Sequence, residues 1–136
     1  MKAVIDTNVV LAGLANRKGA SFKILEHYLH RQFEWVNSQP VLDEYQGVLS
    51  VSQKVAPVHL QIFLHLLRKR TRLVQITGSL RVCKDPDDDK FLETAIIGGA
   101  NFLVTKNLKH FPRKSYQKVR IVTVAAFLKE IEKLFP

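Results

Sequence analysis

Short apolar runs alternate with helix-forming segments along this chain, and that alternation limits its fold more than any other feature. Five short runs are expected to form strands, at 2–6, 33–37, 72–76, 101–105 and 119–123. The segments between and after them predict helices at 21–29, 40–49, 57–70, from about 85 to 96, and 124–135. Apolar strands separated by helices are typical of a parallel sheet covered on both faces. We therefore expect an α/β fold: a three-layer α/β/α sandwich with a mainly parallel sheet of four to five strands.

The spacing of apolar residues and the residues at helix starts support these helices. Within 57–70, Leu60, Phe63, Leu64 and Leu67 follow the i, i+3, i+4, i+7 spacing of one helix face. Thr123 stands where it can cap the last helix. With no internal repeat or linker in 136 residues, we expect one domain over 1–136.

The charge balance narrows the class of partner. Lysine and arginine total 21 against 12 for aspartate and glutamate, a formal net charge of +9. Such a field favours polyanions, nucleic acid above all, although solubility alone is the competing interpretation. Cys83 is the single cysteine, which excludes an internal disulfide and a cysteine zinc cluster and fits a cytoplasmic protein. No apolar run is long enough for a membrane span.

Polar residues follow two of the expected strands directly. Asp6, Thr7 and Asn8 follow the first apolar run, and Thr105 and Asn107 lie at the end of another. Ligands of parallel α/β sheets bind beyond the carboxyl ends of the strands, where these residues would meet. A simpler role for Asp6, favoured when it is considered alone, is to cap the next helix, and Thr7 and Asn8 are equally good caps.

Two further acidic residues can be placed by helical geometry. At about 100° per residue, Glu44 lies at the rim of the apolar face of helix 40–49, while Asp43 points away. A surface glutamate whose stem covers apolar neighbours is the ordinary alternative for Glu44. In the helix that begins near Pro86, Asp88 falls on the apolar face and Asp89 at its edge. An inward aspartate needs a partner or a cation, but Asp88 could equally complete a capping box with Asp85.

Four pieces of sequence, in order along the chain, carry a resemblance to a known family. They are VIDTNVVLAGL, QPVLDEY, CKDPDDDKFLETA and NFLVTKNLKHFP. Each is weak by itself, but the ordered set resembles the PIN domain, the nuclease fold of VapC-type toxins. The similarity extends over essentially the whole chain.

The resemblance implies an endonuclease of single-stranded RNA that uses Mg²⁺ or Mn²⁺. Matched motif by motif, the metal ligands would be Asp6, Glu44 and Asp88, with Asp89 as the alternative third ligand if the register moves by one residue. Carboxylate oxygens suit these hard cations, which lower the pKa of an attacking water. Asn107 stands at the fourth acidic position of the pattern. One well-formed metal site and a second, weak or absent one are therefore expected.

The resemblance also implies partners. A homodimer and a small antitoxin protein would accompany a toxin of this kind. Basic and polar residues next to the acidic motifs are expected to hold the phosphate backbone of RNA. These are Asn8, Arg17, Lys18, Thr105, Lys106, Lys109 and Arg113.

Two other functions compete with the ribonuclease. Asn107 would also be consistent with an RNA-binding PIN domain whose catalysis is weak or lost. A phosphotransferase resembling the haloacid dehalogenases would use Asp6 as a nucleophile. Its DxDxT pattern requires an aspartate where this chain has Asn8, which counts against it.

Overall fold

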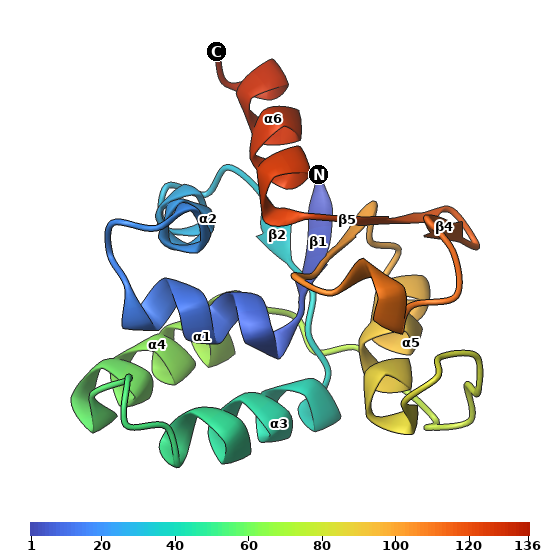
Figure 1. The fold of residues 1–136 in the computed structure, drawn as a ribbon, viewed down its shortest axis with the longest axis horizontal. Helices are drawn as coiled ribbons and strands as arrows, with labels where there is room; N and C mark the ends of the chain where they lie inside the picture. Colours follow the sequence, from blue (N-terminus) through green and yellow to red (C-terminus); the bar gives the residue numbers. More distant parts are fainter.

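The computed structural model describes all 136 residues, and its strands form one five-stranded sheet (Figure 1). The strand order is β2-β1-β3-β5-β4, and only β4 runs antiparallel to its neighbour. The sheet is therefore mostly parallel, as predicted. The strands are β1 (Lys2–Ile5), β2 (Glu34–Trp35), β3 (Phe102–Val104), β4 (Ser115–Tyr116) and β5 (Val119–Val122).

Six α-helices surround this sheet. α5 packs against β1, β3 and β5, whereas α6 packs against β3 and α2. α1 lies between α2 and α3, and α3 also packs against α4 and α5 (Figure 1). None of the helices is long and apolar enough to cross a membrane. The helices are α1 (Thr7–Ala15), α2 (Ala20–Leu29), α3 (Gln39–Ser50), α4 (Pro57–Arg70), α5 (Asp89–Ile97) and α6 (Val124–Leu134), with 3₁₀ turns η1 (Pro86–Asp88) and η2 (Leu108–His110).

Local sequence explains where several helices begin. The Ser38 side chain accepts a hydrogen bond from the Val41 N–H at the start of α3, and the Thr123 side chain accepts one from Ala126 at the start of α6. Pro57 opens α4, where its missing N–H costs no hydrogen bond. The expected cap at Thr123 and the bounds of 57–70 are thus confirmed.

The core consists of 33 buried apolar residues centred on β1 and β3. Ala3, Val4 and Ile5 are completely buried, as are Leu103 and Val104. Strands that are apolar on both faces must be covered by helices on both sides. Trp35 of β2 joins the two ends of the core by packing edge-on against Tyr28 and Tyr45.

The prediction of a strand at 72–76 is wrong. This segment makes a single parallel bridge, between Leu73 and Asn37, and its Leu73 side chain is 44% exposed. The alternation of Val74 and Ile76 with polar residues reflects a segment half-covered by its neighbours rather than a paired strand. The fifth strand is instead β4, which is too short and polar to predict; it pairs with β5 through a tight turn at Gln117 and Lys118.

Gly98 at the end of α5 lies very close to Val36, the residue that follows β2. A Cβ added at Gly98, which caps the end of α5, would overlap Val36 Cγ1 and lie 3.0 Å from the Thr94 carbonyl oxygen. We expect Gly98→Ala to lower the free energy of unfolding by about 1–3 kcal/mol through overpacking. Gly47→Ala on α3, where a Cβ meets nothing within 4 Å, should raise it by about 0.5–1 kcal/mol. Urea denaturation measures both, and equal effects would contradict the packing explanation.

Candidate active site

Asp6 lies at the carboxyl end of β1, in the first position before α1. Its backbone carbonyl accepts the first hydrogen bonds of α1, from Val9 and Val10, but its side chain makes no capping bond. The carboxylate is only 6% exposed and accepts a hydrogen bond from Thr105 Oγ1 at 2.7 Å. The side-chain cap considered for Asp6 is therefore not formed, and its carboxylate faces the neighbouring strand end instead.

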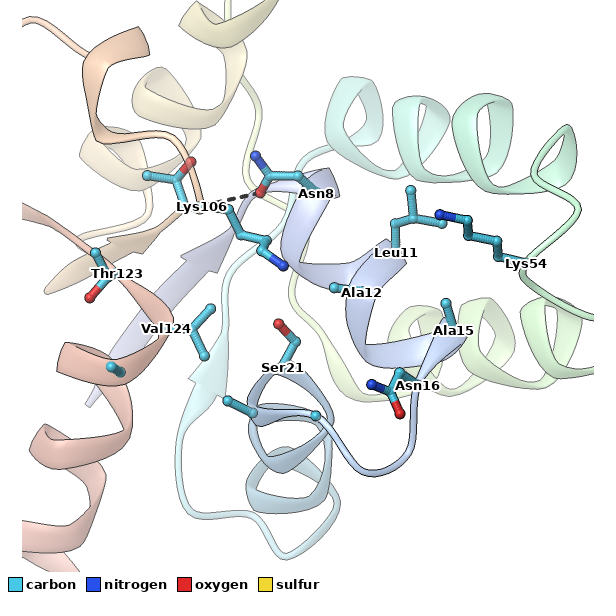
Figure 2. Close-up of a pocket in the computed structure, with 14 residues that line it drawn as sticks. Asn8, Leu11, Ala12, Ala15, Asn16, Ser21, Lys54, Lys106, Thr123 and Val124 are labelled. Carbon is cyan, nitrogen blue, oxygen red and sulfur yellow. Dashed lines mark hydrogen bonds between the residues drawn. The ribbon is translucent and has the colours of Figure 1, made fainter.

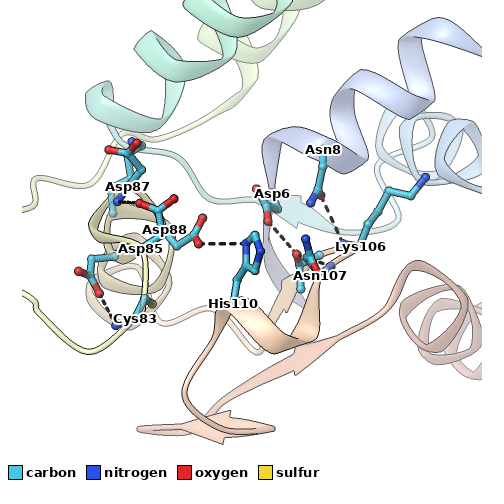
Figure 3. A network of polar contacts seen from close by, with 12 residues as sticks. Asp6, Asn8, Cys83, Asp85, Asp87, Asp88, Lys106, Asn107 and His110 are labelled. Carbon is cyan, nitrogen blue, oxygen red and sulfur yellow. Dashed lines mark hydrogen bonds and ion pairs between the residues drawn. The ribbon is translucent and has the colours of Figure 1, made fainter.

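Thr105 connects the two strand ends. Besides donating to Asp6, its hydroxyl oxygen accepts a hydrogen bond from the Asn107 N–H at 3.0 Å. The Asn8 side chain accepts one from the Lys106 N–H at 3.3 Å, which ties α1 to the same loop (Figure 3). Burial raises the pKa of Asp6; the Thr105 hydrogen bond opposes this effect and the Glu44 carboxylate adds to it.

Glu44 reaches this edge because α3 is attached to the end of β1. The completely buried Tyr45 hydroxyl donates to the Ile5 carbonyl, one residue before Asp6. Glu44 is half-buried, and its carboxylate accepts a hydrogen bond from Thr7 Oγ1. Lys90 Nζ of α5 lies 2.8 Å from its other oxygen. The predicted rim position of Glu44 is confirmed, as is the exposure of Asp43.

Asp88 approaches from the opposite side, at the junction of η1 and α5. Its Oδ2 atom is buried without a hydrogen-bond partner, although His110 Nδ1 lies 3.3 Å away (Figure 3). Burial and then the negative charge of Asp6 raise the pKa of Asp88 to about 6, against the opposing effect of His110. Asp85 caps η1 by accepting from Asp87 N–H. The capping box considered for Asp88 is not formed.

Asp89 serves a different contact. It is 4% exposed, and its Oδ1 atom accepts hydrogen bonds from the N–H groups of Val82 and Cys83 at 3.0 and 2.9 Å. Burial alone would raise its pKa, but these hydrogen bonds outweigh burial and lower it. Asp89 is thus more buried than Asp88, contrary to the helical wheel, because the helix begins with a 3₁₀ turn of about 120° per residue.

Glu93, one turn further along α5, holds the other part of the same loop. The helical wheel predicts it outside the apolar face, yet it is buried. Its carboxylate accepts hydrogen bonds from the N–H groups of Thr77, Gly78 and Leu80. Asp89 and Glu93 therefore attach the irregular 77–83 segment to α5. Backbone N–H groups compensate their buried charges, so these two carboxylates need no bound ion.

The chemistry of the donor set indicates how a cation would fit. No group of three or more Asp, Glu, His or Cys side chains is close enough to hold a metal ion as the side chains stand. Burial and the neighbouring Asp6 carboxylate nevertheless raise the pKa of Asp88, and its buried Oδ2 makes no hydrogen bond. Two carboxylates in this condition suit a hard divalent cation. Glu44 can join them only by giving up Lys90.

A groove of about 810 Å³ begins next to Asp6 and runs between α1 and the first turns of α2 and α6 (Figure 2). The Lys106 side chain points into it, and Lys54 of the α3–α4 connection borders its far end. Asn8 and Thr105 also line it. Arg17, Lys18, Lys109 and Arg113 are exposed and do not line this groove. Of the predicted nucleic-acid contacts, the structure brings together Asn8, Thr105 and Lys106.

Sequence reasoning missed two side chains of the site. Lys90 neutralises Glu44, and Thr7 donates a hydrogen bond to Glu44. Thr7 is next to a predicted motif, but nothing in the sequence distinguishes it from a helix cap. Lys90 carries no signal, because its partner lies on another helix, 46 positions before it in the sequence.

Comparison with known proteins agrees with this architecture. The sequence profile of the PIN domain matches residues 2–109. The uncharacterized protein MJ1680 of Methanocaldococcus jannaschii is 24% identical over 145 aligned positions, covering 98% of this chain and 93% of that protein. A chain in the crystal structure of VapBC2 from Rickettsia felis, bound to a DNA fragment from their promoter, superposes with a TM-score of 0.57 at 21% identity. That match covers 90% of this chain and 98% of the other.

The mostly parallel sheet, with acidic residues at its carboxyl edge after β1, on α3 and at the junction of η1 and α5, defines the class of this protein as an α/β domain. The profile match extends over most of the chain and includes all of these residues. This protein belongs to the PIN domain family.

The raised pKa of Asp88 predicts a pH-dependent stability. A carboxyl whose pKa is about 6 in the folded protein, above its ordinary value of 3.8, stabilises the fold below pH 4, and that contribution is lost as the pH rises through 6. With a divalent-ion chelator present, Asp88→Asn should therefore gain stability relative to the wild type between pH 4 and 7. We expect a gain of about 1 kcal/mol, because partial exposure screens the effect.

Urea denaturation at several pH values measures this gain. Asp43→Asn is the matched control, since it removes one carboxylate from the exposed side of α3. A difference between wild type and Asp88→Asn that stays constant from pH 4 to 7 would contradict the assignment.

Proposed function

We propose that this single-domain protein is a metal-dependent endonuclease of single-stranded RNA and the toxin of a toxin–antitoxin pair. The observation that carries the proposal is the buried Asp88 Oδ2, which makes no hydrogen bond and has His110 Nδ1 3.3 Å away. Burial and then the charge of Asp6 raise the pKa of this carboxyl. Membership of the PIN domain family supports it. The superposed chain comes from a VapBC complex, and that likeness motivates the toxin role.

Asp6 and Asp88 would hold Mg²⁺ or Mn²⁺, and Glu44 would become a third ligand when Lys90 moves away from it. When bound, such an ion polarises the phosphodiester and lowers the pKa of the attacking water. The Thr105 hydroxyl fixes the orientation of the Asp6 carboxylate. Lys106 provides a positive charge in the adjoining groove, where an RNA backbone can lie.

Asn107 and Lys90 favour a second candidate function, an RNA-binding domain with weak or lost catalysis. Asn107 supplies a neutral amide where the family pattern has a carboxylate. Lys90 already neutralises Glu44 at 2.8 Å. Both features lower the negative charge available for a second cation. RNA that is bound by the wild type but not cleaved would favour this function over the nuclease.

Two protein partners belong to the proposal. The toxin role requires a small antitoxin, and its gene should lie next to this one; co-expression and co-purification test the pair.

We also propose a homodimer. Val51, Val58 and Ile62 give α4 and the end of α3 an apolar surface, with exposures of 80%, 60% and 64%. Light scattering of the purified protein measures its mass.

The decisive test is cleavage of single-stranded RNA. With Mg²⁺ or Mn²⁺, the wild type should cut members of an end-labelled RNA panel, and a chelator should stop the reaction. Asp6→Asn should reduce the rate by roughly 100-fold or more, since an amide holds the cation poorly. Asp43→Asn, which removes an exposed carboxylate from the helix of Glu44, should cleave like the wild type. Equal rates for Asp6→Asn and the wild type would contradict the mechanism.

The fourth position gives a separate prediction. Asn107→Asp adds a carboxylate at the loop that Thr105 connects to Asp6. More negative ligands bind a divalent cation more tightly, so thermal stabilisation by Mn²⁺ should appear at about 10-fold lower concentration than in the wild type. Differential scanning fluorimetry during Mn²⁺ titration measures the midpoint. An unchanged midpoint would show that residue 107 does not contact the ion.

A further inference from the structure

A second pocket lies at the opposite edge of the sheet from Asp6. It has a volume of about 430 Å³ and is formed where β1 and β2 begin, where α2 and α4 end, and beside Phe135. We call it the amino-edge pocket. Its volume is in the range of roughly 300–1,000 Å³ that is usual for small-molecule sites. Lys2, at the amino end of β1, borders it, so the length of the strand separates this pocket from Asp6.

Two arginines give the amino-edge pocket a positive charge. Arg70, at the end of α4, donates from Nη1 to the carbonyl oxygens of Tyr28 and Leu29 at 3.1 and 3.2 Å. These contacts fix the guanidinium, which lies 5.6 Å from the centre of the Tyr28 ring, while Nη2 has no hydrogen-bond partner. Arg31 also lines the pocket and forms no ion pair.

The one carboxylate of the pocket is already neutralised. Glu34 Oε2 lies 3.9 Å from Lys2 Nζ, and both side chains are about half exposed. With this pair cancelling, Arg31 and Arg70 leave two net positive charges. A pocket with two guanidinium groups and no free carboxylate attracts an anion, and a phosphate suits the planar fork of arginine best.

The Tyr28 hydroxyl is the second, independent sign of a ligand. Tyr28 is 5% exposed, lines the amino-edge pocket, and its buried oxygen has no hydrogen-bond partner. The charges that act on its phenol are those of Arg70, Arg31 and Glu34, all of which line the same pocket. A buried donor without an acceptor is unfavourable unless a ligand or water completes it.

Arg31 is kept in an unfavourable backbone conformation. Its φ is +58°, in the left-handed region, and it follows α2 in the position that helix ends usually give to glycine. The Arg31 N–H donates to the Tyr28 carbonyl and the Gln32 N–H to the His27 carbonyl, which completes this type of helix end. Glycine would form the same turn without strain. The arginine side chain therefore costs stability that the turn itself does not require.

We propose that the amino-edge pocket binds a small phosphate-bearing ligand, with Arg31 and Arg70 contacting the phosphate and the Tyr28 hydroxyl donating a hydrogen bond to it. Phe33 and the half-exposed Phe135 provide apolar surface for an organic group attached to the phosphate. This site is separate from the acidic residues at the carboxyl edge and does not depend on the nuclease function.

Binding can be measured in a chelator, where the acidic site repels anions and no metal links them to it. The two probes are adenosine 5′-monophosphate and inorganic phosphate. Each is titrated into the protein by isothermal calorimetry at a millimolar salt concentration. We expect the wild type to bind adenosine 5′-monophosphate. Tighter binding than inorganic phosphate would show that the organic group contributes, and equal binding would assign the site to the phosphate alone. No binding of either probe would overturn the proposal.

Three variants separate binding from folding. Arg31→Gly should raise the melting temperature by relieving strain, yet weaken binding at least about 10-fold. Tyr28→Phe should be as stable as the wild type or more so, and bind about 5- to 10-fold more weakly. Lys118→Gly is the matched control, because Lys118 also has a positive φ, of +72°, in the β4–β5 turn. It should gain stability and bind like the wild type. Equal weakening by Arg31→Gly and Lys118→Gly would overturn the site, because it would reflect net charge alone.

Discussion

The hydrogen bond from Thr105 to Asp6 is the contact around which the carboxyl edge of the sheet is arranged. Strands β1 and β3 pair in the register Ile5 to Val104, so the next residue of each strand lies beside the other. Both side chains are buried, and a buried carboxylate is unfavourable without a donor. Thr105 supplies that donor at 2.7 Å. The Tyr45 contact with Ile5 then places α3, and with it Glu44, next to the same point.

The carboxylates at this edge are compensated by individual neighbouring side chains rather than by the protein's overall net charge of +9. Lys90 pairs with Glu44, and His110 lies near Asp88. Asp6 has only a hydroxyl partner. The acidic residues are thus held together partly by cations of the protein, and a divalent ion would compete with Lys90 for Glu44. Asp88 is the least well compensated of these carboxylates, because its buried Oδ2 makes no hydrogen bond.

Much of the fold followed from periodicity, but the site followed only in part. Helix 57–70 and the cap at Thr123 matched their sequence signals because both depend on neighbouring residues. The segment 72–76 misled because its alternating apolar residues make only one isolated bridge, with Val74 next to Gly98 at the end of α5 rather than in a paired strand. Glu44 was placed correctly by helical geometry. Asp89 was not, because a 3₁₀ turn changed the rotation just before it.

The sequence by itself determined the alternation of strands and helices, the parallel sheet, and the polar residues that end β1 and β3. These features depend on contacts within a few residues, whose periods of 2 and 3.6 can be read directly. Only the tertiary structure decided which partners those residues have: Thr105 for Asp6 and Lys90 for Glu44. Each pairing joins side chains from separate elements, between 46 and 99 positions apart. Their proximity depends on how the helices pack on the sheet, which no local pattern contains.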